Sequence, residues 1–282
     1  MSGYYTLNMK CFVCKKNSWE SHYKDLFRCS NCGFIRAKEI YFKIKPEEVY
    51  GKDYFDKGQY ANYKKERLAL EQNFKNRLKD IIKHKREGKL LEIGCAYGYF
   101  LNLAKKNFII SGIDVNSQTT NIASKLTGIK TLTGDFLTQK FSKNTFDVVS
   151  LFDTIEHLQK PKAYLEKIHT LLKPGGIVAI ETGDIDSLLA KVQKERWRLI
   201  DPSVHLTYFS TKTLRNLLEN TGYRILSIKK VSFARSLIQI TYRLGINNIL
   251  RHLKLNFLEK FISNKNISIN TYDIIFVIAQ KQ

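Results

Sequence analysis

The chain has 282 residues, of which 43% are hydrophobic and 12% aromatic, so it can bury the core of one large domain plus a small appendage and is not a disordered chain. No run approaches the roughly 18 uninterrupted apolar residues of a membrane span, and the N-terminal residues lack the apolar stretch of a signal peptide. Five cysteines in such a sequence predict a reducing, cytoplasmic location, where paired cysteines bind metal more often than they form disulfides.

The net charge of +21 comes from 47 basic and 26 acidic residues and is unevenly distributed. Residues 1–88 and 184–282 each carry a net +9, whereas residues 89–183 carry +3. Basic flanks are typical of a protein with an anionic partner. A lysine-rich composition, with 35 lysines against 12 arginines, explains the same charge without any partner. The charge leaves both explanations open.

Four of the cysteines form two C-x2-C pairs, Cys11 with Cys14 and Cys29 with Cys32, separated by 14 residues. Four thiolates at this spacing suit tetrahedral zinc, and Gly33 allows the tight bend after the second pair. Four protein ligands leave no open position, so the zinc is predicted to be structural. We therefore expect a zinc ribbon over residues 1–40. Such ribbons bind nucleic acid, bind substrate or brace a neighbouring domain, and the pattern does not choose between these roles.

Residues 41–88 are rich in tyrosine and lysine and then become helical, with apolar residues at helical spacing from Tyr63 to Lys85. From Lys89 onward, short apolar runs alternate with amphipathic helical stretches, which is the pattern of an α/β fold with a parallel sheet covered by helices. The predicted strands are 89–94, 108–115, 129–136, 146–153 and 176–182, followed by 223–231 and 272–281. We expect one domain over residues 89–282, with a helical insertion at 232–268.

A strand, a glycine turn and a helix start follow one another in LEIGCAYGYF, residues 91–100. Nucleotide-binding α/β domains place their cofactor at such a turn, because the backbone approaches the ligand closely there. Asp114 ends the next strand, where a carboxylate can accept hydrogen bonds from ribose hydroxyls. A dinucleotide turn would need glycine at positions 96 and 99, where this chain has Ala96 and Tyr99. The pattern indicates an adenosine cofactor other than a dinucleotide.

The segment from Glu92 to Gly98 resembles the first motif of class I S-adenosylmethionine-dependent methyltransferases, with Ala96 in place of the usual middle glycine. The resemblance extends over residues 45–282 and implies a Rossmann-like sheet whose last strand is antiparallel. It implies that Glu92 lies near the methionine part of the cofactor, Asp114 near the ribose and Asp135 near the adenine amine. It also makes residues 41–88 a cover for the cofactor pocket. The cofactor-binding residues that it implies are Glu92, Gly94, Cys95, Ala96, Gly98, Asp114, Asp135, Phe136 and Asp153.

The segments IEHL (155–158), KPGG (173–176) and HLTYFS (205–210) are together similar to the branch related to ubiquinone O-methyltransferases. Many members of this branch carry an N-terminal zinc ribbon and modify sugars or small molecules. The resemblance therefore implies methyl transfer to a small-molecule or glycan-like acceptor, including a lipid-linked glycan, at oxygen. The alternative is an RNA methyltransferase that holds nucleic acid with its zinc ribbon and basic flanks. The oligomeric state is not predicted.

The candidates for catalysis follow the fourth and fifth strands of the predicted domain, where they face the cofactor crevice. Some relatives bind a divalent ion with an acid-x-x-Glu-His array, which here corresponds to Asp153, Glu156 and His157; the alternative is that these residues only shape a turn. His205 lies among aromatic residues and is predicted as a base, a metal ligand or a structural residue. Ser210 precedes TLRNLLE and is expected to cap a helix.

The insertion between the last two strands is predicted as an amphipathic helix from Phe233 to Ile262. Its apolar side includes Leu237, Ile240 and Leu244, and Arg235, Gln239, Arg243, Asn247 and Arg251 recur every four residues on the other side. Such a helix is typical of a lid over an acceptor pocket. A second reading adds contact between the basic stripe and anionic headgroups or a pyrophosphate-linked acceptor, which would place the protein at the inner membrane face.

Overall fold

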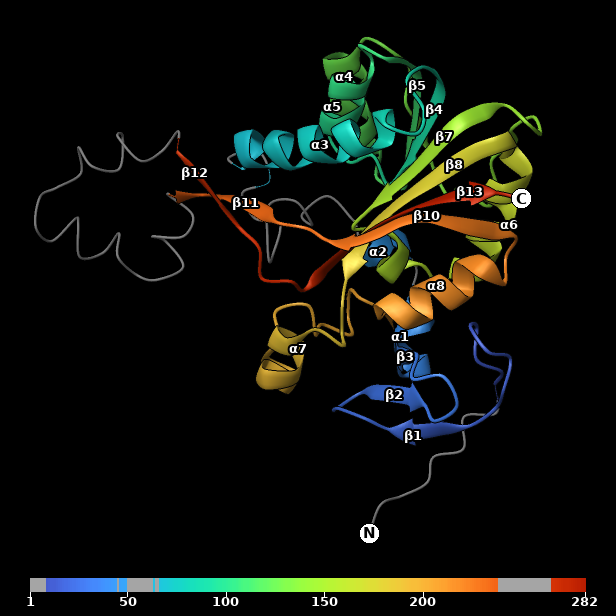
Figure 1. The fold of residues 1–282 in the computed structure, drawn as a ribbon, viewed down its shortest axis with the longest axis vertical. Helices are drawn as coiled ribbons and strands as arrows, with labels where there is room; N and C mark the ends of the chain where they lie inside the picture. Colours follow the sequence, from blue (N-terminus) through green and yellow to red (C-terminus); the bar gives the residue numbers. More distant parts are fainter. Residues whose placement is uncertain (1–8, 45, 50–62, 64–65, 238–264) are drawn as a thin grey trace, which may run out of the picture.

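The computed structural model describes residues 9–44, 46–49, 63, 66–237 and 265–282, and its largest element is a seven-stranded sheet of order β10-β13-β8-β7-β4-β5-β6 (Figure 1). Strands β6, β5, β4, β7 and β8 pair in parallel, whereas β13 pairs antiparallel with both β8 and β10. The predicted parallel sheet with an antiparallel last strand is confirmed. The strands are β4 (Gly88–Ile93), β5 (Phe108–Asp114), β6 (Leu132–Thr133), β7 (Phe146–Phe152), β8 (Leu172–Gly183), β10 (Tyr223–Lys230) and β13 (Ile274–Lys281).

Helices cover both faces of this sheet, as Figure 1 shows. Because side chains alternate along a strand, Leu90 and Val148 pack on one face with α3 and α4, while Leu91 and Val149 pack on the other with α6 and α8. Ser210 caps α8 with its hydroxyl, as expected. The helices are α3 (Arg67–Ile82), α4 (Tyr99–Ala104), α5 (Ser117–Thr127), α6 (Pro161–Leu171) and α8 (Thr211–Glu219).

The N-terminal segment forms a second sheet, of order β1-β2-β3-β9, that includes a strand from the large domain. Strands β1 (Trp19–Ser21), β2 (Leu26–Cys29) and β3 (Ile35–Ala37) precede the short helices α1 (Glu39–Phe42) and α2 (Pro46–Val49). The fourth strand, β9 (Thr207–Tyr208), pairs antiparallel with β3. The N-terminal segment, predicted to end at residue 40, therefore shares a sheet with the rest of the chain.

Between β8 and β9 lie α7 (Leu188–Gln193) and the 3-10 turn η3 (Lys194–Arg196). The prediction of a helix beginning at Phe233 is wrong for its first residues, because β11 (Phe233–Ser236) pairs antiparallel with β12 (Asn266–Ile269). The backbone of Ala234 also exchanges two hydrogen bonds with the side-chain amide of Asn73 on α3, which holds β11 extended. The rest of the predicted basic helix falls on residues 238–264, outside the described part. No helix in the described ranges is long and apolar enough to span a bilayer.

Candidate active site and four-cysteine centre

The glycine turn after β4 brings the backbone close to Asp114 at the end of β5. Gly94 has φ +76°, and a Cβ atom at this position would collide with the hydroxyl of Thr154, so the turn requires glycine. Ala96 adopts φ +44°, and its N–H donates a 2.9 Å hydrogen bond to Oδ2 of Asp114. The other carboxylate oxygen of Asp114 accepts hydrogen bonds from the backbone N–H of Asn116 and the hydroxyl of Thr119. The glycine turn and Asp114, which were predicted to bind the cofactor together, are thus in direct contact.

Glu92, at the end of β4, carries a buried carboxylate oxygen that has no hydrogen-bond partner. Its side chain is 3% exposed, and burial, followed by the nearby Asp114 carboxylate, raises the pKa of Glu92 well above its usual value of 4.5. A buried acid with an unpaired oxygen beside a tight turn fits a ligand that brings a positive charge or hydrogen-bond donors. The methionine part of S-adenosylmethionine carries both an ammonium and a sulfonium. The residues present therefore fit this cofactor.

Four other residues predicted to bind the cofactor lie at the glycine turn or just after β6. Gly98 is the N-cap residue of α4, and Cys95 is buried in the turn. Asp135 follows β6 and accepts hydrogen bonds from the N–H of Leu137 and the hydroxyl of Tyr164. The Phe136 ring is only 1% exposed and packs against Tyr164, so this residue has only backbone atoms to offer a ligand.

Glu156, His157 and His205, the residues predicted to be catalytic, lie together at the carboxyl end of β7. Glu156 and His157 belong to the 3-10 turn η2 (Ile155–His157), and His205 precedes β9. A carboxylate oxygen and one ring nitrogen from each histidine lie within 4.8 Å of one another. The predicted metal set is corrected in one respect: among the described residues this group contains His205 and not Asp153. Asp153 follows β7 with φ +45°, and its N–H donates to the Glu181 carbonyl.

The protonation of the two histidines follows from their backbone contacts. Nδ1 of His157 lies 3.0 Å from the Val204 carbonyl, and Nδ1 of His205 lies 2.7 Å from the Leu199 carbonyl. Because a carbonyl oxygen can only accept, each Nδ1 donates, and Nε2 of the neutral His205 ring is the unprotonated nitrogen. Burial lowers the pKa of His205 below 6.5 and that of His157 to about 3, with His205 as a second cause for His157. Both rings are therefore neutral at pH 7.

Glu156 adds a carboxyl group that lacks a full set of partners. Its Oε2 is buried without a hydrogen bond, and burial, followed by the Asp153 charge, raises the pKa of Glu156 well above 4.5. A small cavity beside it is lined by Glu156, His205, Thr182, Trp197 and Tyr208, among others. The unprotonated nitrogen of His205 and the unpaired Glu156 oxygen can each accept a proton or bind a divalent ion.

A buried ion pair beside this group escaped the sequence analysis. Arg77 on α3 donates through Nε to the Glu181 carboxylate at the end of β8, and through Nη2 to the Ser232 carbonyl at 2.9 Å. Burial raises the pKa of Glu181 to about 7, although Arg77 opposes the shift. The one available signal was an acidic residue at the end of the apolar run 176–182. Its partner is far away in the sequence, and no local pattern indicates it.

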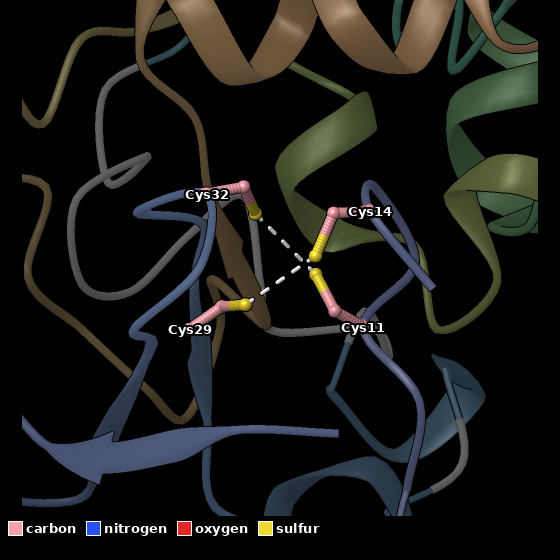
Figure 2. Close-up of side chains that lie close together, drawn as sticks. All are labelled: Cys11, Cys14, Cys29 and Cys32. Atoms are coloured by element: carbon pink, nitrogen blue, oxygen red, sulfur yellow. Dashed lines mark hydrogen bonds between the residues drawn. The ribbon is translucent and has the colours of Figure 1, made fainter. Parts of the chain in front are cut away.

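The four paired cysteines converge on one point, as Figure 2 shows. The Sγ atoms of Cys11 and Cys32 are 3.7 Å apart, and those of Cys14 and Cys29 are 3.6 Å apart. Four sulfurs at about 2.3 Å from a tetrahedral zinc are about 3.8 Å from one another. The spacing of the thiols thus fits the predicted ion. Gly33 has φ +83°, which agrees with the predicted bend after the second pair.

A chain of contacts connects the four-cysteine centre to the group of Glu156, His157 and His205. Strand β3 pairs with β9, and the Ala37 N–H donates to the Leu206 carbonyl. The Leu206 N–H donates in turn to the Glu156 carbonyl at 2.8 Å. Phe34, fully buried after the second cysteine pair, packs on Phe209 with ring centroids 5.4 Å apart. The N-terminal segment thus forms part of the support of these three residues.

A Rossmann-like sheet with a glycine turn, an acid at the end of the second strand and a polar group after the fourth defines a class I, S-adenosylmethionine-dependent methyltransferase. The chain belongs to the family described as "Methyltransferase domain", whose model matches residues 61–228. It is 27% identical over 160 residues to an uncharacterized protein, MJ1123, of Methanocaldococcus jannaschii, covering 57% of this chain and 76% of that one.

Two further similarities agree with this class. The ubiquinone biosynthesis O-methyltransferase of Vibrio atlanticus is 26% identical over 174 residues, covering 56% of this chain and 72% of that protein. The structure of a SAM-dependent methyltransferase from Archaeoglobus fulgidus aligns with a TM-score of 0.53 at 22% identity, covering 75% of this chain and 94% of that one. At this identity the structural likeness shows the fold alone.

Proposed function

We propose that this methyltransferase acts on a hydroxyl group of a small-molecule or glycan-like acceptor, bound at the carboxyl ends of β7 and β8, with His205 as the base. The observation that supports the proposal best is the neutral His205 ring, whose Nδ1 donates to the Leu199 carbonyl and which has a ring nitrogen within 4.8 Å of a Glu156 carboxyl oxygen. The ubiquinone biosynthesis O-methyltransferase of Vibrio atlanticus, a distant relative, is an O-methyltransferase by name.

Methyl transfer to a hydroxyl requires mainly that the enzyme align the reactants, exclude water and remove one proton. S-adenosylmethionine, when bound, supplies a methyl group on its sulfonium. We assign Glu92 to the methionine part, Asp114 to the ribose and Asp135 to the adenine, which leaves Glu156, His157 and His205 on the acceptor side. There His205 Nε2 takes the hydroxyl proton as the acceptor oxygen bonds to the methyl carbon and the carbon–sulfur bond breaks.

His205→Gln should lower the rate of methyl transfer by about 10²- to 10⁴-fold, the usual contribution of a general base. Its affinity for S-adenosylhomocysteine should stay within about 2-fold of the parent value, because the predicted cofactor residues are elsewhere. The exposed His84 offers a matched control, His84→Gln, with both values unchanged. The acceptor is found by screening hydroxylated sugars and phenols for release of S-adenosylhomocysteine. If the His205→Gln protein kept the parent rate of methyl transfer, His205 would not be the base.

We infer, as an alternative to His205 as the base, that a divalent ion held by Glu156, His157 and His205 occupies the acceptor side. The support is the convergence of three donor atoms within 4.8 Å, together with the carbonyl contacts that orient both imidazoles. Titration of Mn²⁺ into protein whose cysteine centre is loaded should show one further ion, which Glu156→Gln and His205→Gln abolish. Binding that survives both substitutions, or no binding, would contradict the ion. If Mn²⁺ binding is lost in His205→Gln, His205 is a ligand of the ion and not the base.

The partner proposals rest on charge. The net charge of +21 motivates two proposals: a cytoplasmic enzyme that touches anionic lipid through its basic insertion, and an RNA methyltransferase that uses its basic flanks. Arg235 is the one member of the predicted stripe in the described residues; it lies on β11 with its guanidinium 4.6 Å from the Phe233 ring. Strongly salt-dependent RNA binding without turnover of small acceptors would favour the RNA reading.

A further inference from the structure

The segment after β6 is held by a single helix in a way that bears on adenine recognition. Asp135 begins this segment, and in the described residues both hydrogen bonds to its side chain go to Oδ1. One comes from the Leu137 N–H at 2.9 Å and the other from the Tyr164 hydroxyl at 2.6 Å. Tyr164 lies on α6, is 8% exposed and packs its ring on Phe136. The two hydrogen bonds orient the carboxylate and leave Oδ2 to accept a hydrogen bond from a ligand.

Lys167, one turn further along α6, fixes the backbone of the same segment. Its ammonium donates to three carbonyl oxygens, those of Phe136 at 2.6 Å, Leu137 at 3.0 Å and Gln139 at 2.6 Å. An ammonium has three N–H bonds, so the whole donor capacity of this side chain is used on one loop. The ammonium also lies 4.7 Å from the centroid of the Phe136 ring. Lys167 therefore links three backbone carbonyls of this loop to α6.

We propose that Tyr164 and Lys167 are positioning residues that make the cofactor site selective for a 6-amino purine. The proposal rests on the adenine role assigned above to Asp135. An adenine amine donates to a carboxylate oxygen, whereas the 6-oxo group of hypoxanthine only accepts and is repelled by it. A polar group held in place rejects a mismatched partner strongly, because both polar groups stay unpaired in the wrong complex. Without the Tyr164 hydroxyl, the Asp135 carboxylate can rotate and accommodate either base.

The experiment compares S-adenosylhomocysteine with S-inosylhomocysteine, in which the 6-amino group is replaced by oxygen, by isothermal titration calorimetry. The parent protein should prefer the adenine ligand by about 10-fold or more. Tyr164→Phe should weaken S-adenosylhomocysteine about 3- to 10-fold, leave S-inosylhomocysteine nearly unchanged and so narrow the preference. Lys167→Met should also narrow the preference for the adenine ligand, because the loop that carries Asp135 loses three hydrogen bonds.

Two control variants remove similar groups from the same region. Tyr223→Phe deletes a buried hydroxyl that donates to the Leu165 carbonyl on α6 but has no contact with Asp135. Lys162→Met removes an α6 lysine that faces Glu166. Both should keep the parent affinity for each ligand and the parent preference.

The outcomes separate the proposal from its premise. If Asp135→Ala binds S-adenosylhomocysteine as the parent does, the adenine role of Asp135 is wrong. If Asp135→Ala loses the preference but Tyr164→Phe and Lys167→Met keep it, the positioning proposal is overturned. Equal weakening of both ligands by Tyr164→Phe would also overturn it, since that result indicates general loosening of the fold. A narrowed preference in Tyr164→Phe and not in Tyr223→Phe supports it.

Discussion

Asp114→Ala should weaken the binding of S-adenosylhomocysteine about 10- to 100-fold, equivalent to about 1.4–2.7 kcal/mol. The carboxylate is expected to receive the ribose hydroxyls, and charge-assisted hydrogen bonds of this kind are about twice as strong as neutral ones. It also accepts the N–H of Ala96 and of Asn116, so its removal loosens the glycine turn itself. Calorimetry on the folded variant measures the effect.

Asp147→Ala is the matched control for this measurement. Asp147 also accepts a backbone N–H, that of Lys89 at 2.8 Å, and forms an ion pair with Lys173 at 2.8 Å. It lies near the start of β7, at the opposite end of the strand from the cofactor crevice. Cofactor affinity should therefore be unchanged in Asp147→Ala. An unchanged affinity in Asp114→Ala, or tighter binding of NAD than of S-adenosylhomocysteine, would show that the ribose assignment is wrong.

Cys11→Ser should lower the zinc content from about one ion per chain to almost none, as expected for the loss of one ligand from a four-coordinate structural site. A large loss of stability should follow, because Cys11, Cys29 and Cys32 share a buried cluster with Leu214 and Leu217 of α8. For a chain of this size, each kcal/mol lost lowers the Tm by about 2–4 °C. Elemental analysis and a thermal melt measure the two effects.

The fifth cysteine offers the control, since Cys95 lies in the glycine turn away from the other four. Cys95→Ser should keep the zinc. In Cys11→Ser, hydrogen exchange should increase at 204–208 and 155–157, because β3 supports β9 and β9 is joined to Glu156 through Leu206. Full zinc content in Cys11→Ser, or exchange unchanged at β9, would contradict this account.

The sequence by itself determined the strands and turns that depend only on residues close together in the chain. The run KLLEI lies in β4 and the run FDVVSLF forms β7, because short apolar runs between helical stretches are typical of strands buried inside a helix-covered sheet. The glycine turn, Asp114 at the next strand end and the two cysteine pairs were predicted from spacing alone. Each depends on backbone geometry within a few residues, or on the rule that parallel strands end at one edge.

The tertiary structure decided which of these parts meet. It placed His205 beside Glu156 and left Asp153 out of that group, paired Arg77 with Glu181, and made β11 a strand where the hydrophobic period indicated a helix. It also joined β3 to β9, so that the N-terminal segment with the cysteine centre contacts the group of Glu156, His157 and His205. These contacts link residues far apart in the chain, and their strength depends on a low-dielectric interior and on strand pairing that exist only after the sheet has formed. For this reason local periodicity predicts the sheet and the cofactor turn but not the neighbours of His205.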